Sequence, residues 1–147
     1  MSLKERLLED MKVAMRTKDD LKKNAIQMAR SAVLQIEKDN KITLDDDGII
    51  EVIAKEVKKR RDAMPEYEKY GRSDIVENLK TEIEALLQYL PKQLTEDELE
   101  EIVKRAIQET GANSARDIGK IMQAVMPTIK GRADGKMVNQ IVKKLFG

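Results

Sequence analysis

Three cations surround a glycine near the end of the chain, in a pattern that could hold a phosphate group. Lys130, Arg132 and Lys136 lie around Gly131 within one short segment. Gly131 can adopt a positive φ without steric strain, so it suits a turn that ends a helix. Asp134 is a typical N-cap residue, which predicts that a last helix begins directly after it. Amides at a helix start and nearby cations both favour anions, so this turn is a candidate phosphate-binding site.

The same turn also fits a simpler interpretation, in which it is only a solvated connection between two helices. Basic loops are common, and a short motif by itself is a hypothesis. Pro127 precedes the turn. Because proline lacks a backbone donor and clashes with the preceding turn, we expect the helix before it to end or kink there. The residues alone leave both interpretations open.

Composition argues against catalysis. The 147 residues include no His and no Cys, the commonest general base and the thiol nucleophile. Acidic runs at Asp45–Asp47 and Glu96–Glu98 fit helix starts, where carboxylates satisfy amides and the helix dipole. No Walker-type loop and no GxGxxG motif occurs. We therefore expect no catalytic residue, no metal ligand and no cofactor.

The net charge is only +1, but its distribution along the chain is uneven. Residues 112–147 contain two acidic residues, Asp117 and Asp134, and seven basic ones: Arg116, Lys120, Lys130, Arg132, Lys136, Lys143 and Lys144. This asymmetry suggests a polyanion as partner, and a basic surface without a ligand is the alternative. A second basic run, Lys58–Arg61, is interpreted as a solvated helix face paired with nearby acids; an auxiliary phosphate contact is its other interpretation.

The hydrophobic pattern predicts helices throughout. Apolar residues recur at helical spacing, and no segment sustains the alternation of a strand. Aromatic residues make up 3% of the chain, so the core must consist of aliphatic side chains and methionines. The methionines assigned to it are Met11, Met15, Met28, Met122, Met126 and Met137. The predicted fold class is all-α, with an N-terminal helical bundle in residues 1–92 and a three-helix tail domain in residues 93–147.

Short polar residues mark the expected helix starts. They are Ser2, Asp19, Thr43 or Asp45, Ser73, Thr95, Ser114 and Asp134. Thr95 is the strongest of these, because Glu98 completes a capping box and Leu94 and Leu99 stand at the positions of a hydrophobic staple. Pro65 either begins a new turn or lies in a helix that continues to Tyr70.

No segment has the apolar length of a membrane span, and the first residues lack the apolar core of a signal peptide. On this basis we expect no membrane partner and a cytoplasmic location.

Three motifs, in order along the chain, resemble one family. They are Tyr89–Leu94 (YLPKQL), Ile118–Lys120 (IGK) and Met126–Asn139, which contains KGRADGK. Together they resemble the GatB/YqeY family, and the whole chain is similar to its stand-alone YqeY-type members. The resemblance implies that the last hundred or so residues are similar to the tail of the B subunit of the glutamine-dependent aspartyl/glutamyl-tRNA amidotransferase. That tail is helical and touches the elbow of the tRNA.

The resemblance implies tRNA or another structured RNA as ligand. Carried over by motif, the RNA contacts are Lys120, Lys130, Gly131, Arg132 and Lys136, with Asn139 as a polar neighbour. The family label is carbon–nitrogen ligase activity with glutamine as amido-N-donor. The ATP-using core of that enzyme lies ahead of the tail and nothing here resembles it. We therefore expect an accessory module, with a tRNA-modifying or aminoacylation enzyme as protein partner.

Two other functions remain open from the sequence. One is a protein-interaction adaptor whose helical grooves bind a partner, with the basic end incidental. The other is a component of a catalytic amidotransferase complex.

Overall fold

The computed structural model describes residues 1–147 and contains seven α-helices, one 3₁₀ turn and no strand, so the predicted all-α class is confirmed. The chain divides into two compact units, Met1–Leu90 (unit 1) and Pro91–Gly147 (unit 2). The boundary predicted from the sequence follows residue 92, two residues after the end of unit 1.

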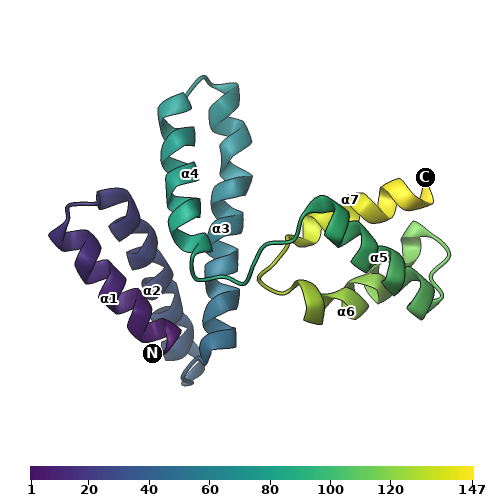
Figure 1. Cartoon of the computed structure of the whole chain (residues 1–147), viewed down its shortest axis with the longest axis horizontal. Coiled ribbons are helices and arrows are strands. Elements are labelled where there is room, and N and C mark those ends of the chain that lie inside the picture. The colour runs from purple at the N-terminus through teal and green to yellow at the C-terminus, as the bar shows by residue number, and fades with distance from the viewer. The chain divides into compact units, whose positions relative to one another are not determined.

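Unit 1 consists of two antiparallel helical hairpins (Figure 1). Its helices are α1 (Leu3–Arg16), α2 (Asp20–Asn40), α3 (Asp46–Lys69) and α4 (Ser73–Leu87). Helix α1 packs against α2, α3 against α4, and α2 against α4. The core between them is mainly aliphatic and includes Leu7, Ile26, Ile53 and Leu86, each almost fully buried. Burial of one such side chain stabilises the fold by about 1.5–3 kcal/mol relative to exposure.

Local capping fixes where three of these helices begin. The side chains of Ser2, Asp19 and Asp45 each accept a hydrogen bond from the backbone amide three residues further on. These three starts are as predicted. Ser73 is not a cap: it is the first helical residue of α4, and the preceding Arg72 makes no side-chain cap bond. Arg72 instead pairs with Asp74, 3.3 Å away, in the first turn of the helix.

Pro65 lies inside α3, which continues to Lys69 without a new start. The helix therefore takes the longer of the two expected forms. Proline removes one backbone donor, but α3 has 24 residues and packs along α4. The remaining hydrogen bonds and the packing outweigh the loss of one bond near the helix end.

The methionines divide between the core and the surface. Met11 and Met122 pack against the two cores, as expected. Met15, Met28 and Met126 do not, because they are 57%, 54% and 46% exposed. Helical periodicity identifies one face of a helix but not how wide a strip of that face a neighbouring helix covers.

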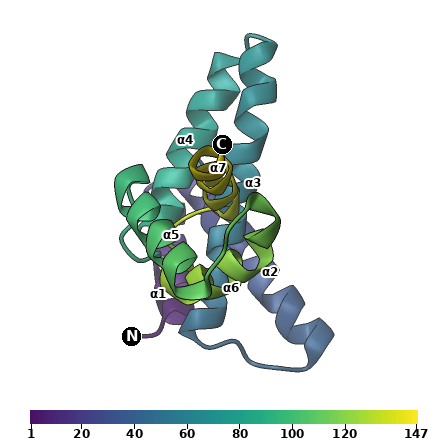
Figure 2. The same cartoon turned by 90° about the vertical axis from the view of Figure 1, so that its right-hand side faces the viewer.

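Unit 2 is a three-helix unit with its own hydrophobic core; its helices α5, α6 and α7 are labelled in Figure 2. It consists of α5 (Glu96–Thr110), the 3₁₀ turn η1 (Ala115–Asp117), α6 (Ile118–Ile129) and α7 (Gly135–Phe146). Helix α5 packs against both α6 and α7, and the core between them includes Leu99, Val103, Ile121 and Val138. The predicted capping box of Thr95 and Glu98 is present with both of its hydrogen bonds.

Candidate functional site

The turn between α6 and α7 is tightly wound around the carbonyl of Ile129. That oxygen accepts from the amides of Arg132, at 2.7 Å, and Ala133, at 3.1 Å. Gly131 has a φ of 72°, the positive value predicted for a glycine in a helix-ending turn. Of the two outcomes expected at Pro127, an end or a kink, the end does not occur: helix α6 continues to Ile129, and the amide of Lys130 still donates to the carbonyl of Met126. Proline near the end of a helix removes one bond without removing the bonds of its neighbours.

Asp134 caps α7, as predicted. Its carboxylate accepts from the amide of Lys136 at 3.0 Å, and its carbonyl accepts from the amide of Met137 at 3.0 Å. The chain's own carboxylate thus occupies the helix start that we expected to offer amides to a phosphate. Any anion contact at this turn would come mainly from side chains.

The segment before α5 is hydrogen-bonded to this turn. The Gln93 side chain donates to the carbonyl of Gly131 at 2.7 Å and to that of Pro91 at 3.1 Å. The amide of Leu94 donates to the carbonyl of Arg132 at 2.9 Å. The Arg132 guanidinium donates back, from Nε to the carbonyl of Lys92 at 3.1 Å. We call these bonds between residues 92–94 and 131–132 the clamp.

The clamp changes the role of Arg132. Its Nη1 also donates to the carbonyl of Thr128 at 3.4 Å, and the residue is only partly exposed. Arg132 was expected to be a solvated phosphate contact, but it binds two backbone carbonyls. These two bonds use two of the five N–H donors of a guanidinium, so the group can hold the turn and still face an anion.

The other predicted site residues lie on the surface of unit 2, but not in one cluster. Lys130, Lys136 and Asn139 are exposed, and Lys136 and Asn139 are one turn apart on α7. Lys120 is also exposed, near the start of α6 and beside a shallow hollow lined by Thr110, Gln123 and Ala124. Lys120 and Lys130, the C-cap of α6, are ten positions apart, or roughly 15 Å along the helix axis. Lys120 is therefore outside the turn.

The motif Tyr89–Leu94 has two halves that serve different units. In unit 1 the Tyr89 ring is buried, with its hydroxyl donating to Asp10 and the Arg6 guanidinium 4.8 Å from the ring centroid. Burial, and then the hydrogen bond to Asp10, raise the pKa of Tyr89 above its usual range. In unit 2 the motif supplies the clamp through Gln93 and Leu94. The sequence pattern indicates the family resemblance and the staple position of Leu94, but not the contact of this motif with the basic turn.

Charges near the turn also act on the start of α5. Hydrogen bonds from the amide and side chain of Thr95 lower the pKa of Glu98, and the charges of Lys92 and Arg132 lower it further.

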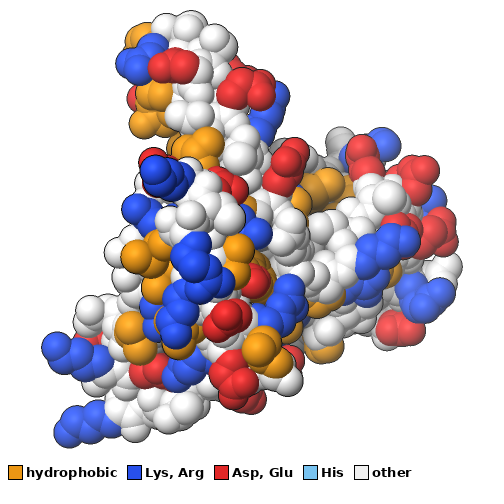
Figure 3. Space-filling view, turned by 60° about the vertical axis from the view of Figure 1, so that its left-hand side comes forward, with side chains coloured by type: hydrophobic (Ala, Val, Ile, Leu, Met, Phe, Trp, Pro, Cys, Tyr) orange, Lys and Arg blue, Asp and Glu red, His pale blue; other side chains and the backbone are white.

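The basic run of unit 1 is only partly a solvated face. Lys58 pairs with Asp62, and Lys59 with Glu56, each at 3.1 Å. Arg60, however, is 6% exposed and lies between Glu56 and Glu82, with 3.4 Å to each carboxylate. On the face of the molecule in Figure 3, basic and acidic side chains are interspersed. The run therefore combines surface ion pairs of Lys58 and Lys59 with a buried ion-pair network around Arg60.

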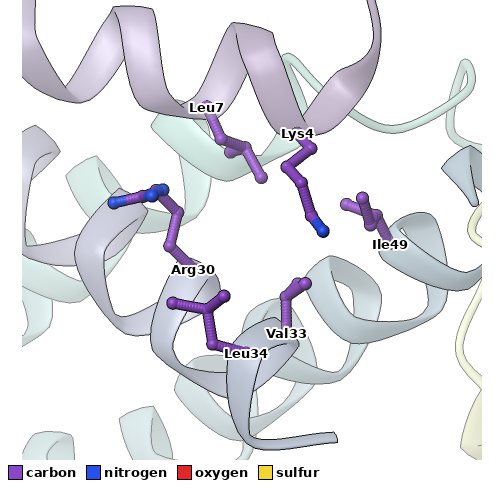
Figure 4. A pocket seen from close by; sticks show the side chains of 6 residues that line it. All are labelled: Lys4, Leu7, Arg30, Val33, Leu34 and Ile49. Atoms are coloured by element: carbon purple, nitrogen blue, oxygen red, sulfur yellow. The ribbon is translucent and has the colours of Figure 1, made fainter. Parts of the chain in front are cut away.

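A small hollow in unit 1 is lined by Lys4, Leu7, Arg30, Val33, Leu34 and Ile49 (Figure 4). Lys4 is bound at its edge by Glu37, with Nζ 2.7 Å from Oε2. This bond and one from the amide of Leu44 lower the pKa of Glu37. The hollow contains no acid–base pair of its own. The chain has no group of three or more acidic residues placed to hold a metal ion, and none of its helices combines the length and the apolar character that a bilayer span requires.

The fold and the turn define a small all-α protein of two helical units with a basic, hydrogen-bonded turn in the second. Residues 4–146 match the family model described as Yqey-like protein, and the chain belongs to this family. The resemblance drawn from the three motifs is thereby confirmed at the level of the family.

Curated relatives come from fungi and share one name, altered inheritance of mitochondria protein 41, mitochondrial. The protein from Pyrenophora tritici-repentis is 31% identical over 147 residues, which cover 97% of this chain and 80% of that protein. The protein from Candida glabrata is 35% identical over 102 residues, covering 68% and 56%. That from Lachancea thermotolerans is 36% identical over 85 residues, covering 57% and 46%. The chain thus spans about half the length of the second and third relatives.

These names contradict the expected cytoplasmic location, because the relatives are named as mitochondrial proteins. The expectation rested on the lack of an apolar segment. Composition and hydropathy describe how a chain interacts with a bilayer and do not specify the compartment in which a folded domain works.

Proposed function

We propose that unit 2 binds structured RNA, with tRNA as the first candidate, through contacts to phosphate groups. The observation that carries the proposal is the exposure of Lys130 and Lys136 on either side of a turn whose backbone is held in one conformation by the clamp. Two ammonium groups on a rigid turn can meet a sugar–phosphate backbone without first losing much conformational entropy.

Recognition would be by charge and shape, because the turn offers no platform for stacking. Phe146 is the one aromatic residue of unit 2, and it is partly buried in the core cluster. Single-stranded recognition relies on bases stacked on aromatic rings, whereas duplex RNA is bound mainly through its backbone. A folded RNA such as tRNA therefore fits better than an unstructured strand.

In this proposal Asn139 and Lys120 are outer contacts. Asn139 follows Lys136 on the exposed face of α7 and can donate to a phosphate oxygen. Lys120 lies near the start of α6, far enough from the turn at the other end of the helix to contact a different phosphate. The protein then acts as an accessory module that brings an RNA to a tRNA-handling enzyme, which supplies the amidation or other chemistry.

A titration of tRNA at several salt concentrations tests the proposal. In the double variant Lys130→Ala/Lys136→Ala, the slope of log affinity against log salt should be shallower by about 2, because each lost phosphate contact removes about 0.9. The charge-matched control is Lys104→Ala/Arg105→Ala, which changes two exposed cations of α5. Equal slopes in the two double variants would remove the turn from the RNA site.

A protein-binding role is the second candidate, and exposed apolar side chains of unit 1 favour it. Tyr70 is 69% exposed at the α3–α4 connection, and Leu34 is 52% exposed on α2. Isolated exposed apolar residues are common on soluble proteins, so this candidate ranks below RNA binding. Chemical cross-linking in cells tests it: a partner captured by wild type but lost in Tyr70→Ser, with tRNA affinity unchanged, would support the adaptor.

A further inference from the structure

The segment just before α5 faces the basic turn and carries an exposed lysine that the proposed site does not include. Lys92 lies between Pro91 and Gln93, and its carbonyl is held by Arg132 Nε at 3.1 Å. Three hydrogen bonds thus connect residues 92–94 to residues 131–132, although the two segments are about forty positions apart in the chain. The backbone of Lys92 is consequently fixed beside the turn that carries Lys130 and Arg132.

The direction of these bonds matters for an anion. The carbonyls of Gly131 and Arg132 both accept hydrogen bonds from the 92–94 segment. A carbonyl oxygen carries partial negative charge and repels a phosphate, so its internal hydrogen bond reduces that repulsion. The side chains that remain around the turn are mostly cationic: Lys92, Lys130, Arg132 and Lys136 against the capping acids Glu98 and Asp134.

We propose that Lys92 is a further phosphate contact and that Gln93 and Arg132 are positioning residues, which hold the 92–94 segment and the 130–136 turn together as one phosphate-binding platform. This proposal rests on the proposed RNA-binding function for the role of Lys92. The clamp itself is a property of the free protein. The two parts can therefore fail separately.

Gln93 supplies the shortest of the three clamp bonds, at 2.7 Å. Its one amide nitrogen donates to two carbonyls, those of Gly131 and Pro91. In Gln93→Glu a carboxylate would face both oxygens with no donor, so the segment should separate from the turn. Gln108→Glu is the matched control, because it makes the same charge change on the exposed side of α5.

The first experiment uses the free full-length protein and hydrogen exchange read by NMR. The Leu94 amide, which donates to the Arg132 carbonyl, should exchange at least about tenfold faster in Gln93→Glu than in wild type or in Gln108→Glu. An unchanged rate in Gln93→Glu would overturn the positioning role of Gln93, whatever the protein binds.

The second experiment is a tRNA titration with single variants of the full chain. Lys92→Ala should lower the salt slope by about 0.9 and the affinity about fivefold near 0.1 M salt. Lys104 is an exposed lysine of α5 that pairs with Glu100. Lys104→Ala should therefore change the salt slope and the affinity less than Lys92→Ala does. Gln93→Glu should weaken binding more than Gln108→Glu, because it also misplaces the turn.

The outcomes separate the two proposals. If wild type binds tRNA and Lys136→Ala lowers the slope while Lys92→Ala matches Lys104→Ala, the platform is wrong and the RNA-binding turn stands. If wild type does not bind tRNA at all, the proposed function and the phosphate contact of Lys92 are both overturned, and the exchange experiment still decides the clamp.

Discussion

Arg60 is buried in unit 1 between two carboxylates. Its Nη1 lies 3.4 Å from Glu56 Oε1, its Nη2 lies 3.4 Å from Glu82 Oε1, and Nη2 also contacts the sulfur of Met28 at 3.5 Å. It therefore links α2, α3 and α4. A buried charge pair contributes little net stability, because desolvation offsets the attraction. Removal of one partner is different, since the other charge is left buried.

Substitution of Arg60 should destabilise unit 1. In Arg60→Met, Glu56, which is 3% exposed in the wild-type protein, loses Arg60 and keeps its ion pair with Lys59, and we expect the free energy of unfolding to fall by about 3 kcal/mol. Lys58→Met removes an exposed cation of the same run and should cost less than about 1 kcal/mol. Urea denaturation of the two variants and wild type measures both values. Equal losses would mean that the network is not energetically distinct from a surface pair.

At the scale of single elements, α5 has the best-defined start. Thr95 accepts from the amide of Glu98 at 3.1 Å, and Glu98 Oε1 accepts from the amide of Thr95 at 3.2 Å. The same helix start receives the clamp through Leu94, which packs against the core of unit 2. The capping box and the basic turn are thus physically adjacent.

The capping box should make unit 2 sensitive to acid. The pKa of Glu98 in the folded protein is lowered from 4.5 by hydrogen bonds of Thr95, so the folded state favours the ionised carboxylate. Its stabilising contribution is present above pH 4.5 and is lost as the pH falls through the lowered folded value. Glu98→Gln preserves the cap geometry without titrating. We expect its melting temperature to fall less between pH 6 and about pH 3 than that of wild type.

Circular dichroism at a series of pH values measures this difference. Glu101→Gln is the control, because Glu101 is an exposed acid of α5 outside the capping box. If Glu101→Gln reduced the acid sensitivity as much as Glu98→Gln, the effect would reflect net charge and not the cap.

At the scale of the whole molecule, the two units have separate hydrophobic cores with no residue in common. Unit 2 contains only the residues from Pro91 to Gly147, a size at which a single core gives marginal stability. The clamp adds hydrogen bonds between the first residues of unit 2 and the turn before α7, and each contributes about 0.5–1.5 kcal/mol. These bonds therefore connect the beginning of unit 2 to the start of its last helix.

Separate cores predict separate responses to a core mutation. Leu86→Ala removes a fully buried side chain of α4 and should destabilise unit 1 by about 2–5 kcal/mol. Hydrogen exchange measured by mass spectrometry should then rise in peptides of α1 to α4 and stay near wild type in α5 to α7. Val103→Ala, in the core of unit 2, should give the reverse pattern. Faster exchange of both units in both variants would show that they unfold together.

Features that depend on neighbouring residues in the chain could be predicted from the sequence. Helix starts at Ser2, Asp19, Asp45, Thr95 and Asp134 follow from side chains that bond amides two or three residues away. The positive φ of Gly131 and the all-α class have the same local origin, because both follow from backbone sterics and helical periodicity. Ser73 and Ser114 are exceptions: at Ser73 the neighbouring Arg72 and Asp74 form a different local pair, and Ser114 caps the 3₁₀ turn that precedes α6.

Contacts between residues far apart in the chain could not be predicted, because they depend on how the helices pack. The clamp joins Gln93 to Gly131, and the ion network joins Arg60 to Glu82. Neither contact follows from a periodic pattern in the sequence, because bonds between distant segments form only when the helices pack together. The same holds for exposure: Met28 and Met11 lie on similar apolar stripes, but neighbouring helices cover only Met11 substantially. Burial is a property of the packed helices, and a single helix cannot specify it.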